Sequence, residues 1–569
     1  MPSDRAQVWS WAAGLGSALS WSALVVRWFD VGEPWRPAWL QALPAWALAL
    51  LTFGLAAFWV RLNWPALRGA RLPGPRGGLW LVLGLAFFFR LPLLWQGSAG
   101  YLSPDGALSG IVSVHLRQGI DHLVFVPSVP YSGSLKSHLA AGLSLGMDSS
   151  RAFALASLLF YLAFVAGLYR LALLLKDQPA WTALAAGLYA AFAPAFVTRY
   201  SLSNDGNYVE VLALGTWALW LAVRWAREPE SDRLLASTGG LLLGLAFWCH
   251  ILAVIHLAAF GLALLLADPR RALRSTLPAL AGWGLGYLPG LLWNAQNGWE
   301  SFLYVLPGGR TVGALDQGPG LVARALNMVR GQWPVLLGYD FGYRREVDVV
   351  MWSLAWSAVV LAVLAVASGL KVALRESRSP LRVLLLFTAG NLLIALFALP
   401  EVPGNPRYLL FLMTPLPILI ARLLVRARPV MIGLVIFGAL GSLGQAPANL
   451  RTDAQWRHFV ASLQAEGVRF CSTDFFLASK LNFLSEERIV CSSKLGPTTT
   501  EYFGAYRARV EAAAEVALIA VNPTAADKLE RRLSRLGVGY ERKNWMKPVL
   551  VHLTRKVEPD ELFGPTENR

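Results

Sequence analysis

The residue whose type and position most clearly suggest chemistry is Asp105, in the stretch Tyr101-Leu-Ser-Pro-Asp105-Gly106-Ala107. It follows an apolar stretch, Gly78–Trp95, and opens a polar, amphipathic segment that runs to about Asp148. A carboxylate at the mouth of a membrane helix is unfavourable unless it has a task. We therefore interpret Asp105 as a catalytic carboxylate that accepts a proton from a reacting hydroxyl. The alternative is that Asp105 caps the following helix, and the two roles do not exclude each other.

A second acidic residue, Asp205, lies in Ser201-Leu-Ser-Asn204-Asp205-Gly206-Asn207-Tyr208, also at the start of an apolar stretch. A helix cap is again the alternative. If the two helices converge, Asp105 and Asp205 would bind a divalent cation such as Mg²⁺ or Mn²⁺, or orient an acceptor hydroxyl. No other cofactor is indicated. Glu210, further along the same predicted helix, is a secondary candidate because intramembrane carboxylates are usually functional.

Basic side chains are the candidates for binding a phosphate. Arg407 follows Asn405 and precedes Tyr408, at the predicted outer end of an apolar stretch. An Arg there departs from the usual cytoplasmic bias of basic residues, and its forked donors suit a lipid phosphate or diphosphate. Snorkelling to the interface is the alternative. Lys136 and His138, in the first outer segment, are candidates for the same task.

His250 is another secondary candidate, as are the residues that flank Arg407, Asn405 and Tyr408. His250 and His256 lie just after Cys249, but not at the spacing of zinc ligands. The sequence therefore favours a hydrogen-bonding role for His250 near the outer surface over a metal site.

The composition shows what kind of scaffold must position these residues. Of the 569 residues, 55% are hydrophobic and 15% are charged, whereas a soluble globular chain has about 25% charged residues. This is the composition of a membrane protein. The net charge of +16 fits Lys- and Arg-rich cytoplasmic loops and anionic membrane lipids better than nucleic acid. The first apolar stretch, Val8–Phe29, has no small-residue cleavage site, so it predicts a membrane anchor.

A membrane-spanning helix needs about 20 apolar residues, or somewhat fewer before a tight turn. The sequence predicts a polytopic α-helical protein with 13 spans: Trp9–Trp28, Trp39–Val60, Gly78–Trp95, Ala152–Leu175, Ala180–Val197, Tyr208–Trp225, Leu234–Cys249, Ile251–Ala267, Leu277–Trp293, Met351–Leu370, Leu381–Leu399, Tyr408–Val425 and Val430–Leu443. Leu234–Ala267 could instead be one broken hairpin.

The loop charges predict the orientation. With 13 spans, the clusters of Arg and Lys that separate them all fall on one side, which the positive-inside rule makes cytoplasmic together with the N-terminus. These residues are Arg61, Arg68, Arg71, Arg76, Arg170, Lys176, Arg224, Arg227, Arg233, Arg270, Arg271, Arg274, Lys371, Arg375, Arg378, Arg382, Arg426 and Arg428. The outer side then carries the loops 96–150, 198–207 and 294–350 and the tail from Gln445.

The tail predicts a soluble α/β domain, residues 446–569, on the outer side. Strands are expected at 467–473, 488–492, 516–521 and 548–553, and helices at 454–465, 475–484 and 524–536. Cys471 and Cys491 fall on consecutive strands, which allows a disulfide in an oxidising compartment. Two buried thiols on neighbouring strands are the alternative.

This pattern resembles the GT-C-fold membrane glycosyltransferases, and most closely the bacterial relatives of protein O-mannosyltransferases and lipid A aminoarabinose transferases. The likeness rests on Asp105 after a membrane helix, Asp205 in a short outer loop, Arg407-Tyr408-Leu-Leu at a late span, and the trailing domain. It covers roughly Gly78 to Val425. The resemblance implies three regions: two extra helices in 1–77, a catalytic module in 78–445 with outer loops 96–150 and 294–350, and the tail domain.

The resemblance also implies a function. It predicts inverting transfer of a hexosyl or pentosyl group from a polyprenyl-phosphate donor to an acceptor (a lipid, a glycan or a protein) on the periplasmic side of a bacterial inner membrane. Asp105 matches the family's catalytic acid, Asp205 the second acidic position, and Arg407 a late basic residue that holds the donor phosphate. Gly106 stands where the protein mannosyltransferases carry a second acid. A transporter or flippase of lipid-linked or small polar substrates is the alternative function, and a non-catalytic envelope scaffold is a third.

Overall fold

The computed structural model describes residues 74–176, 179–203, 205–304, 320–339, 345–376, 379–397, 399, 405–495, 502–557 and 561–562, with the side chains of 345–350 excepted. The predicted spans Trp9–Trp28 and Trp39–Val60 lie outside these residues, as does part of the predicted outer loop 294–350. The chain divides into two compact units. The helical unit comprises Met1–Gln96, Leu158–Ser201 and Tyr208–Arg451, and the α/β unit comprises Gly97–Ser157, Leu202–Asn207 and Thr452–Arg569. The structure thus groups the first predicted outer loop with the tail.

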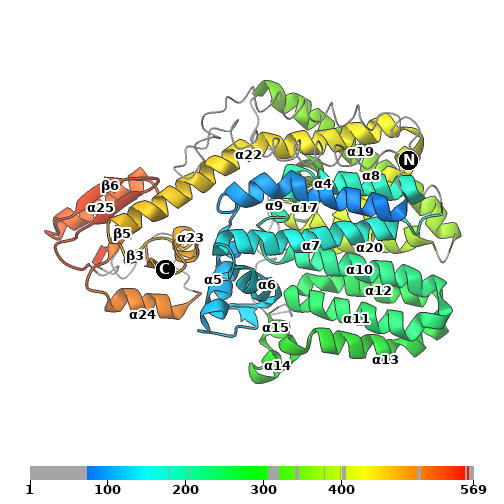
Figure 1. Cartoon of the computed structure of the whole chain (residues 1–569), viewed down its shortest axis with the longest axis horizontal. Coiled ribbons are helices and arrows are strands. Elements are labelled where there is room, and N and C mark those ends of the chain that lie inside the picture. The colour runs from blue at the N-terminus through cyan, green and yellow to red at the C-terminus, as the bar shows by residue number, and fades with distance from the viewer. Residues whose placement is uncertain are drawn as a thin grey trace, which may run out of the picture. The chain divides into compact units, whose positions relative to one another are not determined.

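The helical unit consists of apolar helices joined by short turns (Figure 1). Its first half contains α4 (Pro75–Gln96), most of α7 (Ser149–Ala172), α8 (Pro179–Ala191), α9 (Ala195–Tyr200), α10 (Tyr208–Arg227), η1 (Pro229–Ser231), α11 (Asp232–Cys249), η2 (Ile251–Ala253), α12 (Val254–Ala267), α13 (Pro269–Gly286), α14 (Leu288–Gln296) and α15 (Glu300–Leu303). Its second half contains α17 (Leu321–Asn327), η3 (Met328–Gln332), α18 (Trp333–Leu337), α19 (Arg345–Arg375), α20 (Pro380–Phe397), η4 (Arg407–Met413), α21 (Pro415–Leu423), η5 (Leu424–Arg426) and the start of α22 (Arg428–Ala465).

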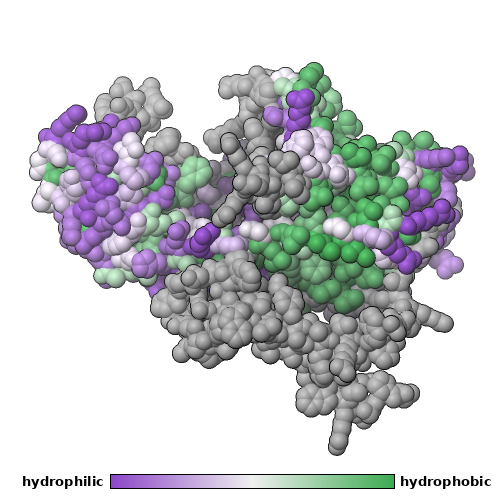
Figure 2. Space-filling model, turned by 90° about the horizontal axis from the view of Figure 1, so that it is seen from above, coloured by the Kyte–Doolittle hydropathy of each residue, from purple (hydrophilic) through white to green (hydrophobic). Residues whose placement is uncertain are grey.

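Among the described residues, six helices are long and apolar enough to cross a membrane: α4, α7, α10, α19, α20 and α22. The pair Arg407–Met413 and Pro415–Arg426, bent by 48°, would make a seventh. Hydrophobic residues gather over the helical unit, while hydrophilic residues cover the α/β unit (Figure 2). The chain is therefore a multi-pass membrane protein.

These seven segments coincide with seven of the predicted spans. The other predicted spans within the described residues fall on α8 with α9, on α11, on α12 and on α13 with α14, which do not meet the same standard of length and apolarity. The count of 13 stays a prediction. Leu234–Ala267 is interrupted at His250, whose extended backbone separates α11 from η2 and α12.

Helices α11 and α13 approach until their backbones touch, and they lie side by side with α10 and α12 (Figure 1). A Cβ atom on Gly240 would lie 2.0 Å from the Ala279 carbonyl oxygen, and one on Gly282 would lie 2.0 Å from the Ser237 carbonyl oxygen. Gly244 and Gly286 repeat these contacts four residues later. Small residues spaced by four are the usual means of close helix packing in lipid, where no hydrophobic force drives helices together.

The α/β unit is built on a five-stranded sheet in the order β4-β3-β5-β7-β6. The strands are β3 (Phe470–Ser472), β4 (Val490–Ser492), β5 (Ala517–Ile519), β6 (Glu541–Asn544) and β7 (Pro548–Val551). β3 is parallel to β4 and β5, whereas β7 is antiparallel to both β5 and β6. The helices are α5 (Pro104–Gln118), α6 (Leu135–Leu143), α23 (Phe475–Leu484), α24 (Gly504–Ala512), α25 (Pro523–Arg535) and the last turns of α22, and a hairpin of β1 (Phe125–Val126) and β2 (Val129–Gly133) precedes α6.

Alternate side chains of the sheet pack on opposite layers. Leu518 and Leu550 contact the apolar face of α25, whereas Ile519 and Val549 join the cluster that includes Phe459 from the end of α22. Because successive strand residues point to opposite faces, this is a three-layer α/β arrangement. The described strands and helices of the tail match the predicted ones, but α24 and β6 were not predicted.

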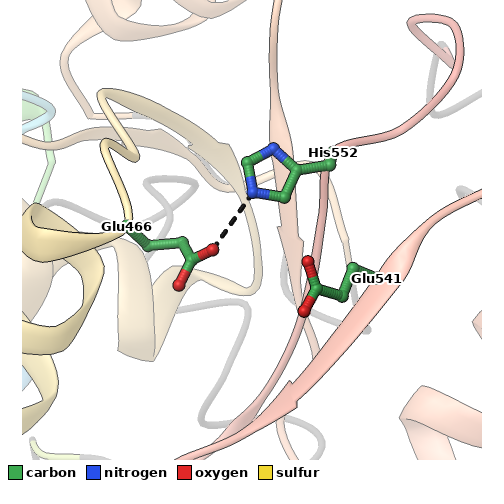
Figure 3. A group of neighbouring side chains, drawn as sticks. All are labelled: Glu466, Glu541 and His552. Carbon is green, nitrogen blue, oxygen red and sulfur yellow. Dashed lines mark hydrogen bonds and ion pairs between the residues drawn. The ribbon is translucent and has the colours of Figure 1, made fainter.

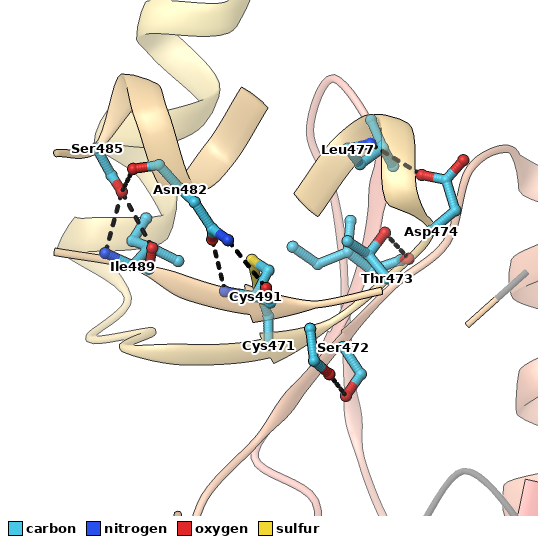
Figure 4. Close-up of a disulfide and its surroundings, with 11 residues drawn as sticks. Cys471, Ser472, Thr473, Asp474, Leu477, Asn482, Ser485, Ile489 and Cys491 are labelled. Atoms are coloured by element: carbon cyan, nitrogen blue, oxygen red, sulfur yellow. Dashed lines mark hydrogen bonds between the residues drawn. A yellow bond between two sulfur atoms is a disulfide. The ribbon is translucent and has the colours of Figure 1, made fainter. Parts of the chain in front are cut away.

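A disulfide joins Cys471 and Cys491, which are register partners on the parallel strands β3 and β4 (Figure 4). Asn482 completes this edge of the sheet: its amide nitrogen donates to the Cys491 carbonyl oxygen at 3.0 Å, and its Oδ1 accepts from the Cys491 N–H at 2.7 Å. The side chain thus substitutes for a neighbouring strand, and the cystine is enclosed on all sides.

Candidate active site

Asp105 lies in the first turn of α5, but it does not provide the helix cap. That role belongs to Ser103, whose Oγ accepts from the Gly106 N–H at 3.0 Å and which precedes Pro104 at the start of the helix. A Ser followed by Pro is a typical helix start. Asp105 itself is exposed. The capping explanation for an acid at this position therefore does not apply, while the helix N-terminus still favours a negative charge there.

The apolar face of α5 is covered by the α/β unit itself. Ile111 and Val112 are fully buried in a cluster with Phe475 and Phe483 of α23. The Gly110 Cα faces the Phe483 ring so closely that a Cβ would lie 2.6 Å from the ring, so α5 is held against α23 at short range.

The far end of α5 is held by charges. The ring nitrogens of His115 contact Glu487 Oε1 at 3.0 Å and Asp121 Oδ2 at 3.3 Å, and Arg117 contacts Glu486 at 2.9 Å. Burial alone would lower the pKa of His115, but the carboxylates of Glu487 and Asp121 outweigh it and raise that pKa. Packing and ion pairs together fix α5, and so fix where its first turn presents Asp105.

Asp205 lies in a loop that the structure places next to the start of α5. The Ser203 carbonyl oxygen is 3.5 Å from the position of a Cβ on Gly106, and the Ser203 hydroxyl donates to Asp205 Oδ1 at 3.3 Å. Gly206 and Asn207 have positive φ values of 90° and 63°, a conformation that Gly and Asn tolerate best. The loop therefore turns sharply directly after Asp205, which is largely buried.

Lys136 is carried by α6, which is tied to both of these segments. The Ser137 hydroxyl donates to the Ser109 carbonyl oxygen of α5 at 2.8 Å, and Asn207 donates to the Gly133 carbonyl oxygen at 2.6 Å and to Ser132 Oγ at 3.0 Å. The α/β unit thus brings together the segments that carry Asp105, Asp205 and Lys136.

Within this group the two basic candidates differ. The Lys136 side chain is buried, with its Nζ 4.2 Å from the centre of the Phe153 ring. His138 is exposed, and its Nδ1 lies 2.9 Å from the Ser134 carbonyl oxygen of its own helix. A buried ammonium is expensive to maintain, so Lys136 is the stronger candidate for binding an anion.

Arg407 belongs to an aromatic cluster of the helical unit. Its guanidinium donates to the Tyr408 hydroxyl at 2.9 Å, and its backbone N–H donates to Asn405 Oδ1 at 3.1 Å. The Tyr208 ring lies 6.2 Å from the Tyr408 ring and 5.1 Å from the His250 ring. The structure therefore brings together four of the sequence's candidates, namely Arg407, Tyr408, Asn405 and His250, and adds Tyr208, which the sequence analysis did not single out.

The structure also shows the surroundings of two secondary candidates, His250 and Glu210. His250 Nδ1 accepts from the Leu252 N–H at 3.1 Å, so the ring caps η2, which is the hydrogen-bonding role that the sequence favoured. Glu210 is fully buried in the first turn of α10. Neither observation places these side chains beside Asp105.

Arg90 is a buried cation that the sequence analysis missed. It lies within α4 and donates to Ser201 Oγ at 2.6 Å and to the carbonyl oxygens of Ala191 at 2.8 Å and Ala190 at 3.4 Å. The Tyr161 ring covers its guanidinium at 4.3 Å. Arg90 therefore satisfies the last carbonyls of α8 and holds Ser201, the residue after which the Asp205 loop begins. The sequence signal that points to Arg90 is a lone Arg inside a predicted membrane span, because such residues are rare there and usually have a role.

No curated protein matches the chain in sequence. Residues 138–293 match the family described as dolichyl-phosphate-mannose-protein mannosyltransferase, over little more than a quarter of the chain. ArnT from Cupriavidus metallidurans in the apo state has a similar structure, with a TM-score of 0.57 and 13% identity over 83% of this chain and 97% of that one. The chain has the GT-C fold.

The same ArnT bound to undecaprenyl phosphate superimposes with a TM-score of 0.56 and 12% identity, again over 83% of this chain and 97% of that one. The oligosaccharyltransferase AglB from Archaeoglobus fulgidus, in complex with an inhibitory peptide and a dolichol-phosphate, gives a TM-score of 0.44 and 11% identity over 78% and 69% of the two chains. The second likeness is too loose to support an argument. The predicted resemblance to GT-C membrane glycosyltransferases is confirmed.

Proposed function

We propose that this protein is an inverting glycosyltransferase that moves a sugar from a polyprenyl-phosphate donor to an acceptor hydroxyl. The observation that carries the proposal is the position of Asp105: an exposed carboxylate on a rigidly held helix start that another residue, Ser103, already caps. The GT-C fold supports a transferase. The family matched by residues 138–293 is named for dolichyl-phosphate-mannose, and the similar ArnT structure holds undecaprenyl phosphate, which supports a polyprenyl-phosphate donor.

In the proposed reaction the acceptor hydroxyl loses its proton to the Asp105 carboxylate as its oxygen attacks the anomeric carbon. The bond from that carbon to the phosphate oxygen breaks on the opposite side, and the polyprenyl phosphate leaves with the electron pair. A correctly placed general base contributes roughly 10²- to 10⁴-fold to such a rate. Asp205 orients the acceptor hydroxyl in this scheme.

Binding of the donor phosphate is assigned to cations. Arg407 offers forked donors, and its guanidinium is already oriented by the Tyr408 hydroxyl, while Asn405 holds its backbone N–H; Lys136 offers a buried ammonium. Stabilising the negative charge that develops on the leaving phosphate is usually the largest electrostatic contribution to such a reaction. A divalent cation held by Asp105 and Asp205 remains a prediction, tested by the effect of a chelator on transfer.

The membrane placement belongs to the same proposal. The Lys and Arg clusters put the N-terminus on the cytoplasmic side, so the α/β unit and the reaction would face the periplasm of a bacterial inner membrane. Tags placed near the two ends of the chain test this orientation. In sealed vesicles, a tag on the outer side is accessible to an added reagent, and a tag on the inner side is protected; the proposal predicts opposite results for the N-terminal tag and the tag on the α/β unit.

The activity is tested with purified protein in proteoliposomes that contain radiolabelled polyprenyl-phosphate sugar and an envelope extract as acceptor. We expect the label to leave the prenyl lipid and to appear in a larger product. Arg407→Gln should weaken undecaprenyl-phosphate binding about tenfold or more, because a charge-assisted contact is lost. The matched variant Arg426→Gln, at an exposed arginine, should bind normally. Movement of intact labelled lipid across the bilayer without transfer of the sugar would contradict the proposal and favour a flippase.

A further inference from the structure

Three side chains with metal-binding chemistry converge away from the candidate active site, at one end of the sheet in the α/β unit. Each of Glu466, Glu541 and His552 offers a ligand atom within 4.8 Å of the other two. Their carboxylate and imidazole ends point toward one another (Figure 3). His552 Nε2 lies 3.1 Å from Glu466 Oε1. Among the residues that the structure describes, this is the group of three such ligands that lies close enough to share an ion.

The fold explains why three distant residues meet. Glu541 begins β6 and pairs with Val551 of β7, so His552, the next residue along, lies beside it at the end of the hairpin. His552 has a positive φ of 52°, which turns its side chain out of the strand direction. Glu466 follows the last residue of α22, where the helix ends and the chain turns towards β3.

The two faces of β6 separate this group from the neighbouring charges. Arg542 and Asn544 point to one face, where Arg542 contacts Asp527 and Glu530 of α25. Glu541 and Lys543 point to the other, and Lys543 Nζ lies 2.6 Å from Glu541 and 3.3 Å from Glu466. Lys543 is therefore the cation that the two carboxylates hold in this structure.

We propose that Glu466, Glu541 and His552 form a zinc-binding site that exchanges Lys543 for the metal. One imidazole nitrogen and two carboxylate oxygens suit zinc, whereas Mg²⁺ and Ca²⁺ prefer oxygen ligands alone. Zinc bonds of about 2.1 Å place two ligand atoms about 3.4 Å apart, and the His552–Glu466 pair is already near that separation. The three side chains are partly exposed, so small rotations about their side-chain bonds would bring the Glu541 carboxylate to the same ion.

The surroundings leave a coordination position open. A cavity of about 500 Å³ adjoins the group and is lined by Glu466 and His552 together with Arg469, Glu515 and Lys556. Three protein ligands and one position facing a cavity is the arrangement of zinc sites that take a further ligand, in contrast to closed structural sites. The site would therefore accept an anionic or carbonyl oxygen from the cavity, near two basic side chains.

The proposal is tested by equilibrium dialysis of Zn²⁺ against the full-length protein in detergent, with Mg²⁺ as the comparison ion. We expect one Zn²⁺ per chain. Glu466→Gln and His552→Gln should each weaken Zn²⁺ binding by at least about tenfold. Even the loss of a residue that only holds a metal ligand in place lowers metal affinity by about 10- to 100-fold. Lys543→Met should tighten binding about tenfold, because the competing ammonium is removed.

Two matched variants separate this site from unspecific binding. Arg542→Met removes a cation from the other face of β6, and His458→Gln removes another exposed imidazole of the α/β unit; both should bind Zn²⁺ as the original protein does. Thermal unfolding provides a second readout, since a ligand that binds only the folded state raises the Tm by an amount that grows with the logarithm of its concentration above the Kd. Two results would contradict the proposal: the original protein binds no Zn²⁺, or the variants Glu466→Gln and His552→Gln bind Zn²⁺ as tightly as the original protein does. Either result would show that the group is only an ion-pair cluster that anchors the edge strand.

Discussion

The two units satisfy their buried charges in different ways. In the helical unit, the buried Arg90 guanidinium contacts backbone carbonyl oxygens, the Ser201 hydroxyl and the Tyr161 ring. The ion pairs described in that unit lie at helix ends: Lys176–Glu376, Arg224–Glu228 and Arg271–Asp232. In the α/β unit, buried or half-buried carboxylates pair directly with cations, as in His115–Glu487, Arg117–Glu486 and Arg457–Asp453.

This difference follows from the solvent of each unit. In lipid every polar group must find a partner inside the protein, and helix-end carbonyls are the most available acceptors. Ionised carboxylates need water or strong partners. In the described contacts they find such partners at helix ends in the helical unit and beside cations in the α/β unit. The following changes test this contrast.

The largest effect on stability is expected from Arg90→Met. The substitution removes the donor to the buried Ala191 carbonyl oxygen and to Ser201 Oγ, and it leaves the Ala190 carbonyl oxygen with the Tyr161 hydroxyl; it should lower the free energy of unfolding by roughly 3–5 kcal/mol. Arg90→Lys should recover only part of it, because the fork is lost. Thermal unfolding in detergent measures the change. Arg76→Met, at an exposed arginine of the same helix, should change stability by less than about 0.5 kcal/mol. Equal effects at the two positions would contradict the role of Arg90.

The next effect concerns the disulfide, which belongs to the α/β unit. Replacing Cys471 and Cys491 by Ala should destabilise that unit by about 2–4 kcal/mol, because the bridge restricts the unfolded chain. Denaturant unfolding with and without reductant measures it. Reductant should destabilise the original protein but not the double variant. An effect of reductant on the double variant would show that the loss has another origin.

Added methyl groups should distinguish the packing of the two units. Gly244→Ala places a Cβ 2.2 Å from the Trp283 carbonyl oxygen, a backbone atom that cannot move without separating α11 from α13. Gly110→Ala places a Cβ 2.6 Å from the Phe483 ring, which can rotate aside. Overpacking costs about 1–3 kcal/mol, and we expect Gly244→Ala at the upper end and Gly110→Ala at the lower end. Gly261→Ala, with open space around it, serves as the control and should be neutral or stabilising.

The smallest effect is a pH dependence confined to the α/β unit. The carboxylates of Glu487 and Asp121 overcome burial and raise the pKa of His115. The stabilisation from charged His115 is therefore fully present below the unfolded-state pKa of about 6.5, and it is lost as the pH rises through the higher folded-state pKa. Unfolding curves measured on both sides of this window should show the decline. His115→Gln should flatten it; an unchanged decline in that variant would assign the effect to another group.

The sequence predicted much of this architecture because its signals are local. Apolar stretches of about 20 residues predicted α4, α7, α10, α19 and α20. Short segments with the residue types of strands, bounded by turn residues, predicted β3, β4, β5 and β7. β6 escaped because Glu541–Asn544 is a charged edge strand without apolar alternation, a common way to protect a sheet edge. α22 was predicted as two helices, yet it continues through Pro447.

The candidate site was less accessible to prediction, since its contacts are long-range. The types of Asp105, Asp205 and Lys136 could be read, but not the hydrogen bonds that tie their segments together, such as Ser137 to Ser109. His115 and Glu487 are 372 residues apart in the chain. The cap is an exception, because Ser103-Pro104 is a local signal for a helix start.

The central claim is that the Asp105 carboxylate does chemistry rather than hold the helix start. The most direct test compares Asp105→Asn with Ser103→Ala in the sugar-transfer assay, with unfolding and undecaprenyl-phosphate binding measured alongside. Ser103→Ala should cost about 1 kcal/mol of stability through the lost cap and leave transfer nearly intact. Asp105→Asn should leave stability and lipid binding nearly unchanged and lower transfer by about 10²-fold or more. Full activity in a well-folded Asp105→Asn protein would contradict the account.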